Sequence, residues 1–477
     1  MFTNQPFSPG SRLALFVGLL GMGIGVFAGF LVGANPQLLG MGLIAVVLMI
    51  WFFAKFEQAV ISLLILRSSL DIFYAQQIPA AFAIGLDALT LLYVTTQLLT
   101  GKAIKVDKFW WFFASWVALQ GVSVILLSLG GLGLDSSYFP EVIREWVRLF
   151  SWLMAYLLIM QLQQRMHPNK IVNALFLSLV APLTAATLQL ILPSSLLPPL
   201  LKPRALALTD IEGASRINGT LGHANTFATF LIFFLGLTYW KLEKSQRRWP
   251  WFLLLSVIIF FIVATKALVC LVMASVLIMV LIAPKFSPVK LIGGILLFTV
   301  IIGLFASTDF GRERLASVLE TPLFNPDMDI SRSILLSNSD GNSFNWRLAH
   351  WDTLLKAWRQ SPIFGYGLGT TSIIGGNEAH NDYVRWLVEG GVVGLGLFLT
   401  FLGANFVRLA KLWFSSPQGS PKKDLALVLF ATLMAISIGM MTENIWSHTA
   451  LFYYWLTTSA IVGWDWNNSQ IVKSNNK

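Results

Sequence analysis

Charged side chains are scarce in this sequence, since Asp, Glu, Lys and Arg make up 12% of its 477 residues. A typical soluble domain carries roughly 25% charged residues, so a water-soluble globular fold is excluded. Hydrophobic residues make up 56% of the chain. Apolar runs of about 20 residues recur from end to end, and each is long enough to cross about 30 Å of hydrocarbon. We therefore expect an all-α polytopic membrane protein.

Cysteine and cofactor-binding motifs are nearly missing as well. The single cysteine, Cys270, lies inside an apolar run, which excludes an intrachain disulfide and argues against a cysteine-based metal site. The five histidines are scattered and predict no metal site, and no Gly-x-x-x-x-Gly-Lys-Ser/Thr motif supports ATP-driven transport. The net charge of +10 comes without a basic block interleaved with aromatic residues, so nucleic acid is not expected as a partner. We expect no metal and no cofactor.

The apolar runs predict about 12–14 transmembrane helices. The first run is longer than the apolar core of a signal peptide and is expected to be a retained helix. The third run is interrupted by Arg67, Asp71 and the Ser68–Ser69 pair. The candidate spans are residues 13–33, 38–55, 57–75, 80–100, 109–130, 142–162, 171–192, 224–241, 249–265, 267–283, 290–306, 390–410, 424–442 and 444–463.

The distribution of cations predicts the orientation. With a cytoplasmic N-terminus, the lysine-rich links near residues 102–108, 241–248 and 411–423 face the cytoplasm, as the positive-inside rule requires, and the C-terminus is cytoplasmic too. The outer cations are mostly arginines, whose planar fork binds phosphate or carboxylate bidentately. We divide the chain into N-terminal transmembrane helices (1–192), central transmembrane helices with the loop that carries Arg216 (193–306), a large extracytoplasmic loop (307–389), and C-terminal transmembrane helices with a cytoplasmic tail (390–477).

The second half of the large extracytoplasmic loop reads as an amphipathic helix. Over residues 346–359, the apolar side chains Leu348, Trp351, Leu355 and Trp358 recur at helical spacing, with charged residues between them. Such a pattern is typical of a helix that lies in the membrane interface. Gly365-x-Gly367-x-Gly369 follows this helix rather than a strand, so it does not predict a nucleotide-binding loop.

His380 lies where the outer loop leads into an apolar helix. Histidine titrates near neutral pH, so this residue is a candidate general base or phosphate ligand. The N-terminal end of a helix also favours anions. A histidine that is hydrogen-bonded to loop carbonyls is the plainer alternative. Further along the same helix, Glu389 requires a partner or a wet cavity, because it is a carboxylate at membrane depth.

A second polar segment precedes the apolar run at 224–241. It holds Arg216, which can reach an anion at the membrane interface, and Gly219 and Gly222, which permit close backbone approach. A simple turn before a helix explains the segment equally well.

Together these segments resemble the O-antigen ligase and O-antigen polymerase superfamily of bacterial membrane glycosyltransferases. The resemblance covers roughly residues 205–405. One departure is Thr265-Lys266-Ala267, which stands where many relatives carry Ser-Arg-Gly. The matching blocks are Arg216-Ile-Asn-Gly-Thr-Leu-Gly-His-Ala-Asn225, Trp346-Arg347 through Arg359-Gln-Ser-Pro-Ile-Phe-Gly-Tyr-Gly-Leu-Gly369, and His380-Asn-Asp-Tyr383 followed by Glu389-Gly-Gly-Val-Val-Gly394.

The resemblance implies a GT-C-like, metal-independent, inverting transferase in the bacterial inner membrane, acting in lipopolysaccharide or exopolysaccharide biosynthesis. Its donor would be a glycan on undecaprenyl diphosphate, and its acceptor a glycan, lipid or protein, with membrane lipid around it. Carried over by residue, Arg216 and Arg347 match the two diphosphate-binding arginines and His380 the essential loop histidine. The supporting residues would be Asn225, Asn381, Tyr383 and Glu389.

Three classes of function remain open. The first is a transferase that acts as ligase, as polymerase or in protein O-glycosylation. The second is a transporter, because some cyanobacterial relatives of the superfamily have been labelled as involved in bicarbonate uptake. The third is a non-catalytic scaffold for polysaccharide assembly. Arg216, Arg347 and His380 favour the first class, whereas a transporter should show broken helices that meet at mid-membrane.

Overall fold

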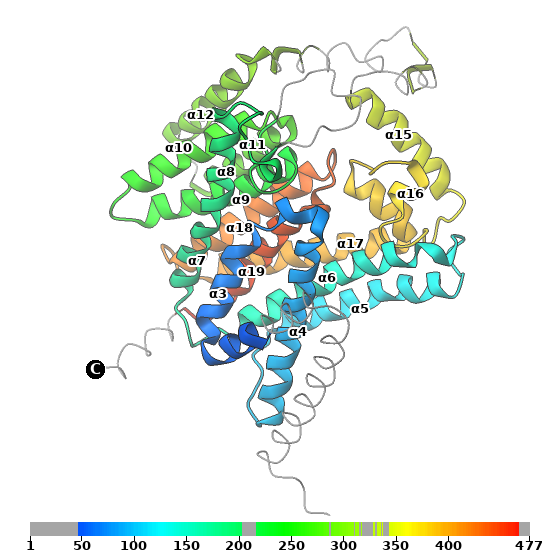
Figure 1. Cartoon of the computed structure of the whole chain (residues 1–477). Helices are drawn as coiled ribbons and strands as arrows, with labels where there is room; N and C mark the ends of the chain where they lie inside the picture. Colours follow the sequence, from blue (N-terminus) through cyan, green and yellow to red (C-terminus); the bar gives the residue numbers. More distant parts are fainter. Residues whose placement is uncertain are drawn as a thin grey trace, which may run out of the picture.

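The described part of the chain is built from helices. The computed structural model describes residues 46–202, 216–285, 288–309 and 343–466, together with isolated positions between 311 and 336. No β-strand occurs in these residues, which confirms the all-α fold. The α-helices (Figure 1) are α3 (Phe56–Arg67), α4 (Ile78–Leu99), α5 (Lys108–Ser128), α6 (Phe139–Met160), α7 (Pro168–Leu175), α8 (Val180–Ile191), α9 (Ala224–Lys244), α10 (Trp249–Ala264), α11 (Leu268–Ile282), α12 (Pro288–Ala306), α15 (Ser343–Trp358), α16 (Thr371–Gly375), α17 (Asp382–Ser415), α18 (Pro421–Gly439) and α19 (Thr449–Val462). Short 3-10 helices are η1 (Asp71–Gln76), η2 (Ser136–Tyr138), η3 (Phe176–Leu179), η4 (Pro199–Leu201), η5 (Ala283–Lys285) and η7 (Ile445–Ser447).

Most helices begin and end within a few residues of the predicted spans. Four helical stretches among the described residues are long and apolar enough to cross a membrane: α4, α5, Pro168–Ile191 and α17. Three further apolar helices are shorter: α10, α11 and Ile292–Ala306. These stretches agree with a polytopic membrane protein, while the number of 12–14 spans and their orientation stay predictions. The predicted span 13–33 and residues 38–45 of the predicted span 38–55 lie outside the described residues, and residues 46–54 are helical.

The predicted span 57–75 is wrong as one continuous helix. Helix α3 ends at Arg67, and η1 begins at Asp71. The Arg67 guanidinium donates to the Asp71 carboxylate over 2.7 Å, and the backbone N–H of Ser68 donates to the Tyr454 hydroxyl over 3.2 Å. Arg67 is buried, and leaving its charge unpaired would cost folding free energy. Pairing with Asp71, four residues later, therefore favours a turn of the chain here.

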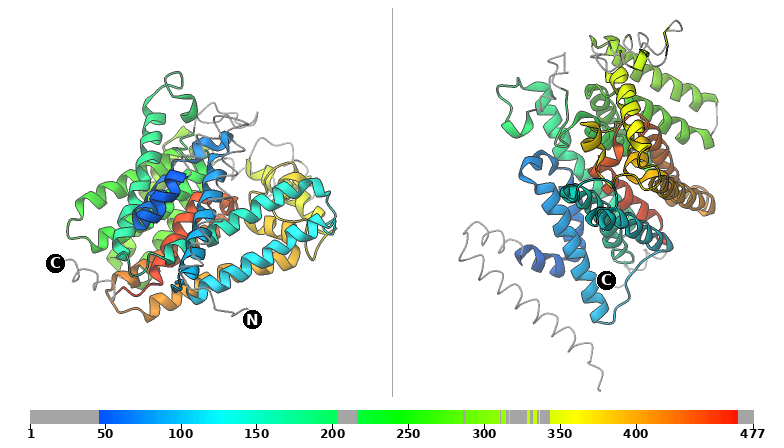
Figure 2. Two further views of the ribbon diagram at one scale, coloured as in Figure 1. Left: turned by 60° about the horizontal axis from the view of Figure 1, so that its bottom comes forward. Right: turned by 90° about the vertical axis from the view of Figure 1, so that its right-hand side faces the viewer.

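Helices from the two ends of the chain share one core. Helix α6 packs against α4, α5 and α19, while α18 packs against α9, α11 and α17. Figures 1 and 2 show α5 and α6 running beside α17. The fully buried Trp446, which follows α18, lies with its ring 4.7–6.1 Å from six aromatic rings. Large aromatic side chains contribute most to such a core, so the segment between α18 and α19 is firmly anchored.

Helix α17 is broken at Gly391, whose φ of 61° and ψ of −162° are not helical. The segment that carries Gly365 passes directly against the break. A Cβ atom on Gly391 would lie 2.2 Å from the carbonyl oxygen of Ile363, and one on Gly365 would lie 2.4 Å from that of Val388. The glycines at 365 and 391 are therefore needed for close backbone contact rather than for binding a nucleotide.

The same segment restores the backbone hydrogen bonds that the break removes from α17. Two carbonyls before Gly391 accept N–H groups from the segment, and two N–H groups after it donate to carbonyls of the segment. Buried peptide groups are thereby satisfied on both sides. The four bonds run from Tyr366 N to Val388 O (3.2 Å), from Gly367 N to Glu389 O (2.8 Å), from Val392 N to Pro362 O (2.9 Å) and from Val393 N to Ile363 O (3.2 Å).

The amphipathic stretch 346–359 forms helix α15 as predicted. Helix α15 contacts α16 and α17, and the residues it buries include Asn345, Ala349 and Leu354. The predicted apolar face, which includes Trp351 and Trp358, stays partly exposed. The position of α15 in the membrane interface stays a prediction.

Candidate functional site

The candidate site is centred on the carboxylate of Glu443, in the segment between α18 and α19. One oxygen, Oε1, lies 3.3 Å from Nδ1 of His380 and accepts the backbone N–H of Asn444 over 3.2 Å. The other, Oε2, accepts a hydrogen bond from the Asn225 amide and lies 3.6 Å from Nη2 of Arg347. Segments distant in sequence thus meet at one buried carboxylate.

Arg216 joins this cluster through Asn225. Its Nη2 donates to Oδ1 of Asn225 over 2.7 Å, while the amide nitrogen of the same side chain donates to Glu443. The Nε of Arg216 donates to the carbonyl of Thr265 over 3.0 Å, at the turn between α10 and α11. The three principal residues of the predicted site, Arg216, Arg347 and His380, therefore gather around Glu443.

The turn that carries Arg216 is held by Gln189 of α8. The Gln189 side-chain oxygen accepts the backbone N–H groups of Asn218 (3.0 Å) and Gly219 (2.9 Å). Its nitrogen donates to the Asn218 side chain over 2.6 Å. Gly219 has a φ of 57°, which favours glycine, and a Cβ there would lie 2.8 Å from the Pro182 carbonyl. Gln189 thus orients the turn that presents Arg216.

Helix α9 begins at the site. His223 caps this helix, since its Nδ1 accepts the backbone N–H of Asn225 over 3.2 Å. The positive end of the α9 dipole consequently lies next to Asn225, where it favours an anion. Burial lowers the pKa of His223. The negative charge of Glu443 acts in the opposite direction, and the positive charge of Arg216 lowers the pKa further. His223 is therefore a neutral cap at physiological pH.

Helix α15 presents Arg347 and is tied to the segment that carries His380. The indole nitrogen of Trp351 donates to the Ala379 carbonyl over 2.6 Å, and Nε2 of His350 lies 3.2 Å from the Asn377 carbonyl oxygen. The ring centroids of Trp346 and His380 are 5.9 Å apart in an edge-on arrangement. These contacts fix the first turns of α15 against the loop that precedes α17.

His380 has a left-handed backbone, with a φ of 49°. This conformation is uncommon for residues other than glycine and costs roughly 1–3 kcal/mol, so it persists only where the surroundings impose it. Here the next two residues are fixed: the Asn381 side chain caps α17, and the backbone N–H of Asp382 donates to the Met440 carbonyl over 2.8 Å. These contacts hold the backbone of His380 in this conformation beside Glu443.

The electrostatics of the site centre on the Glu443 carboxylate. Burial alone would raise the pKa of Glu443, but the hydrogen bond from His380 and the charge of Arg347 outweigh it and hold that pKa well below its usual range. The carboxylate is therefore charged, and its side chain is only 4% exposed. The Arg347 guanidinium lies beside this carboxylate, and the Arg216 guanidinium is linked to it through the Asn225 side chain. The side chains of Arg347 and His380 remain 22% and 26% exposed and can be reached by a substrate.

The supporting residues predicted from the sequence lie in different places. Asn225 is at the centre of the site. The Asn381 side chain accepts the backbone N–H groups of Tyr383 (3.0 Å) and Val384 (3.1 Å), and the Tyr383 hydroxyl donates to the Ser437 carbonyl over 2.8 Å. The contacts of these two residues position α17, whereas Glu389 belongs to a separate cluster.

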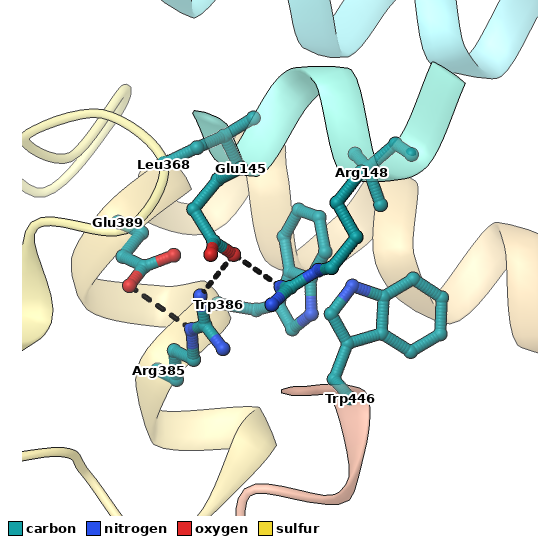
Figure 3. A pocket seen from close by; sticks show the side chains of 8 residues that line it. Glu145, Arg148, Leu368, Arg385, Trp386, Glu389 and Trp446 are labelled. Carbon is teal, nitrogen blue, oxygen red and sulfur yellow. Dashed lines mark hydrogen bonds and ion pairs between the residues drawn. The ribbon is translucent and has the colours of Figure 1, made fainter. Parts of the chain in front are cut away.

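That separate cluster pairs Glu389 with Arg385, one turn earlier on α17 (Figure 3). The Arg385 guanidinium donates to Glu389 over 3.0 Å and to Glu145 of α6 over 2.6 Å, and Glu145 also pairs with Arg148. The Glu389 carboxylate further accepts the Thr371 hydroxyl over 2.5 Å. A cavity between these side chains has room for about one water molecule. The partner that Glu389 requires is thus Arg385.

Glu443, the residue at the centre of the site, was not among the residues predicted from the sequence. The signal for it was present, because Glu443 is a single carboxylate in the one-residue gap between the predicted spans 424–442 and 444–463. The predicted topology puts that gap on the same side as His380. A carboxylate at the end of an apolar span requires a partner, and the outer arginines were the available cations.

Comparison with known proteins agrees with the resemblance drawn from the motifs. A family model described as O-antigen ligase matches residues 251–399. The matched stretch includes Arg347 and His380, while Arg216, Asn225 and Glu443 lie outside it. This match confirms the resemblance to the O-antigen ligase and polymerase superfamily. No curated protein matches the chain.

Proposed function

We propose that this chain transfers or polymerises glycan from an undecaprenyl-diphosphate-linked donor at the outer face of the bacterial inner membrane. The O-antigen ligase match supports a glycosyltransferase-type activity in surface polysaccharide biosynthesis. The observation that carries the proposal is the meeting of Arg216, Arg347 and His380 around Glu443. Each residue alone has a plain structural explanation, and their convergence is what distinguishes a site from coincidence.

The two arginines are proposed to hold the donor diphosphate. When the bond between the sugar and the diphosphate breaks, negative charge builds on the leaving group, and preorganised guanidinium groups stabilise that charge. Arg347 and Arg216 lie on either side of the Glu443–Asn225 pair, and the N-terminus of α9 adds a third favourable field. This arrangement supplies the positive charge that a metal ion provides in other transferases.

His380 is proposed to act on the acceptor as general base. Its Nδ1 faces Glu443, so Nε2 is the nitrogen available to an acceptor hydroxyl. Nε2 takes the hydroxyl proton, the acceptor oxygen forms a bond to the anomeric carbon, and the bond from that carbon to the diphosphate oxygen breaks. The electron pair leaves on the diphosphate, and the proton stays on the imidazole until water or the leaving group accepts it. One displacement of this kind inverts the anomeric configuration.

Transport is the second candidate function, and the break in α17 is the observation that favours it. Discontinuous helices in transporters expose peptide groups that bind substrate or ions. Here the peptide groups beside Gly391 are hydrogen-bonded to residues 362–367, and the charges of Arg385, Glu389 and Glu145 pair with one another. The break is thus filled by the protein itself, which favours the transferase over a bicarbonate-uptake-like transporter.

The deciding experiment places the purified chain in lipid nanodiscs with undecaprenyl-diphosphate glycan. A ladder of longer chains would indicate a polymerase, and release of undecaprenyl diphosphate only with an added acceptor would indicate a ligase. If neither product forms, the transferase proposal is wrong. Uptake of labelled bicarbonate into proteoliposomes then tests the transporter, and a scaffold would be inactive in both assays.

A further inference from the structure

Glu443 lies at the centre of the site, but its carboxylate is too buried to contact a substrate directly. Its side chain is 4% exposed, whereas Arg347 and His380 beside it are 22% and 26% exposed. A substrate at this site would therefore contact the arginine and the histidine before the carboxylate. Any effect of Glu443 on the reaction would be exerted on its neighbours.

The two oxygens of Glu443 serve different partners. Oε2 faces Asn225, which in turn holds Arg216, and lies 3.6 Å from Arg347. Oε1 lies 3.3 Å from Nδ1 of His380. The contacts to Arg347 and His380 are longer than the 2.7–2.9 Å of a strong charge-assisted hydrogen bond. The carboxylate is thus shared between the proposed donor-binding group and the proposed base, and it is bound tightly by neither.

We propose that Glu443 is a positioning residue that neutralises Arg347 while the donor is absent and strengthens its hold on His380 when the donor binds. This inference rests on the proposed function. The donor diphosphate competes with Oε2 for Arg347, because both are anions that suit the same fork. Once the diphosphate has replaced Glu443 as the partner of Arg347, the carboxylate charge acts on His380. It fixes Nδ1 as the protonated nitrogen and stabilises the imidazolium that forms during transfer, as a carboxylate does in a catalytic triad.

Neighbouring contacts allow this exchange without moving the backbone. The peptide N–H of Asn444 donates to Oε1, and the buried Trp446 anchors the segment that follows. Asp382, next to the His380–Asn381 pair, accepts the backbone N–H of Trp446 over 2.8 Å. The segment that carries Glu443 and the one that carries His380 are therefore locked together, while Arg347 enters from α15 and can change partners by side-chain rotation.

The test compares Glu443→Gln with the wild type in two assays, binding of undecaprenyl diphosphate and single-turnover glycan transfer. Glutamine keeps the shape of the side chain and removes its charge. We expect undecaprenyl diphosphate to bind at least threefold more tightly, because the competing anion is gone, and transfer to be at least 100-fold slower. In a His380→Ala background, the same substitution should leave the residual transfer rate within twofold while still tightening binding.

Asp107→Asn is the matched control. Asp107 is also a carboxylate paired with an arginine, since it lies 3.1 Å from Arg408, and it accepts the Tyr156 hydroxyl over 2.8 Å. Its neutralisation should change neither binding nor transfer more than twofold. If Glu443→Gln folds poorly, Glu443→Asp replaces it; this variant keeps the charge but withdraws it from Arg347 and His380, and it should show the same two opposite changes to a smaller extent.

The outcomes separate the two proposals. Opposite changes of affinity and rate in Glu443→Gln support the positioning role, because a purely structural defect lowers both together. Unchanged values, or a parallel loss of affinity and rate, would overturn it. Absence of transfer by the wild type would overturn the proposed function instead, and the affinity assay would still decide whether Glu443 competes with a diphosphate.

Discussion

The carboxylate of Glu443 lies 3.3 Å from Nδ1 of His380, although 63 positions separate the two residues in the chain. Two hydrogen bonds of the neighbouring Asp382 hold the pair together. The backbone N–H of Asp382 donates to the Met440 carbonyl, and the Asp382 carboxylate accepts the backbone N–H of Trp446. Both bonds join the start of α17 to the segment between α18 and α19. The geometry of the pair is thus fixed by hydrogen bonds between the start of α17 and the segment that follows α18.

Replacing His380 with asparagine should remove the base and leave the backbone in place. Asparagine adopts left-handed conformations more readily than most residues, so the φ of 49° is kept. We expect glycan transfer to fall about 10²–10⁴-fold, the usual contribution of a general base. Binding of undecaprenyl diphosphate should stay within about threefold, because the arginines are intact. Equal losses of binding and transfer would place His380 on the donor instead.

Replacing Arg347 with lysine should damage donor handling although the charge is kept. A lysine ammonium is a point charge and cannot form the two parallel hydrogen bonds of a guanidinium with phosphate. We expect transfer to fall about 100-fold, as for the loss of one transition-state donor, with weaker binding of undecaprenyl diphosphate. Lys356, on the same helix and 69% exposed, offers a control: Lys356→Arg should leave both quantities unchanged. A wild-type-like Arg347→Lys enzyme would argue against the diphosphate role.

The positions of the helices were predictable because their signal is local. Apolar runs bounded by charged or proline-containing links determine α4, α5 and α9–α12 with little reference to the rest of the chain. The end of α3 is the informative exception. Arg67 and Asp71 stand in an apolar run, and only their pairing with each other, together with the hydrogen bond from Ser68 to Tyr454, shows that the helix stops there.

The site was predictable only in part because its contacts are long-range. Arg216, Arg347 and His380 stand in recognisable motifs, but nothing in their spacing indicates that Glu443 connects them. Gln189 is still harder to anticipate, since it is a single amide on an apolar helix and clamps a turn about 30 residues away. Identifying it requires knowledge of which helix lies beside the turn that carries Arg216.

The predicted topology can be tested by labelling single cysteines. Glu378, two residues before His380, and Gln418, between α17 and α18, are both exposed. In a Cys270→Ala background, a membrane-impermeant maleimide should label Glu378→Cys on intact spheroplasts and Gln418→Cys only after the membrane is opened. The native Cys270 is buried, so its removal serves as a precaution. Labelling of Gln418→Cys from outside and of Glu378→Cys only after opening would invert the whole topology.

The break in α17 predicts that Gly391→Ala is strongly destabilising. A methyl group there would lie 2.2 Å from the Ile363 carbonyl oxygen, and the φ of 61° is unfavourable for alanine. Both effects act on a buried contact that includes four backbone hydrogen bonds, so we expect the free energy of unfolding to fall by about 2 kcal/mol or more, measured as a lower Tm in detergent.

Gly396→Ala is the matched control on the same helix, because a Cβ there meets no atom within 4 Å and alanine is the better helix former by about 1 kcal/mol. The control should therefore be neutral or slightly stabilising. Equal thermal stability of the two variants would mean that residues 362–367 do not fill the break, and the peptide groups beside Gly391 would then be open to a ligand, as the transporter alternative requires.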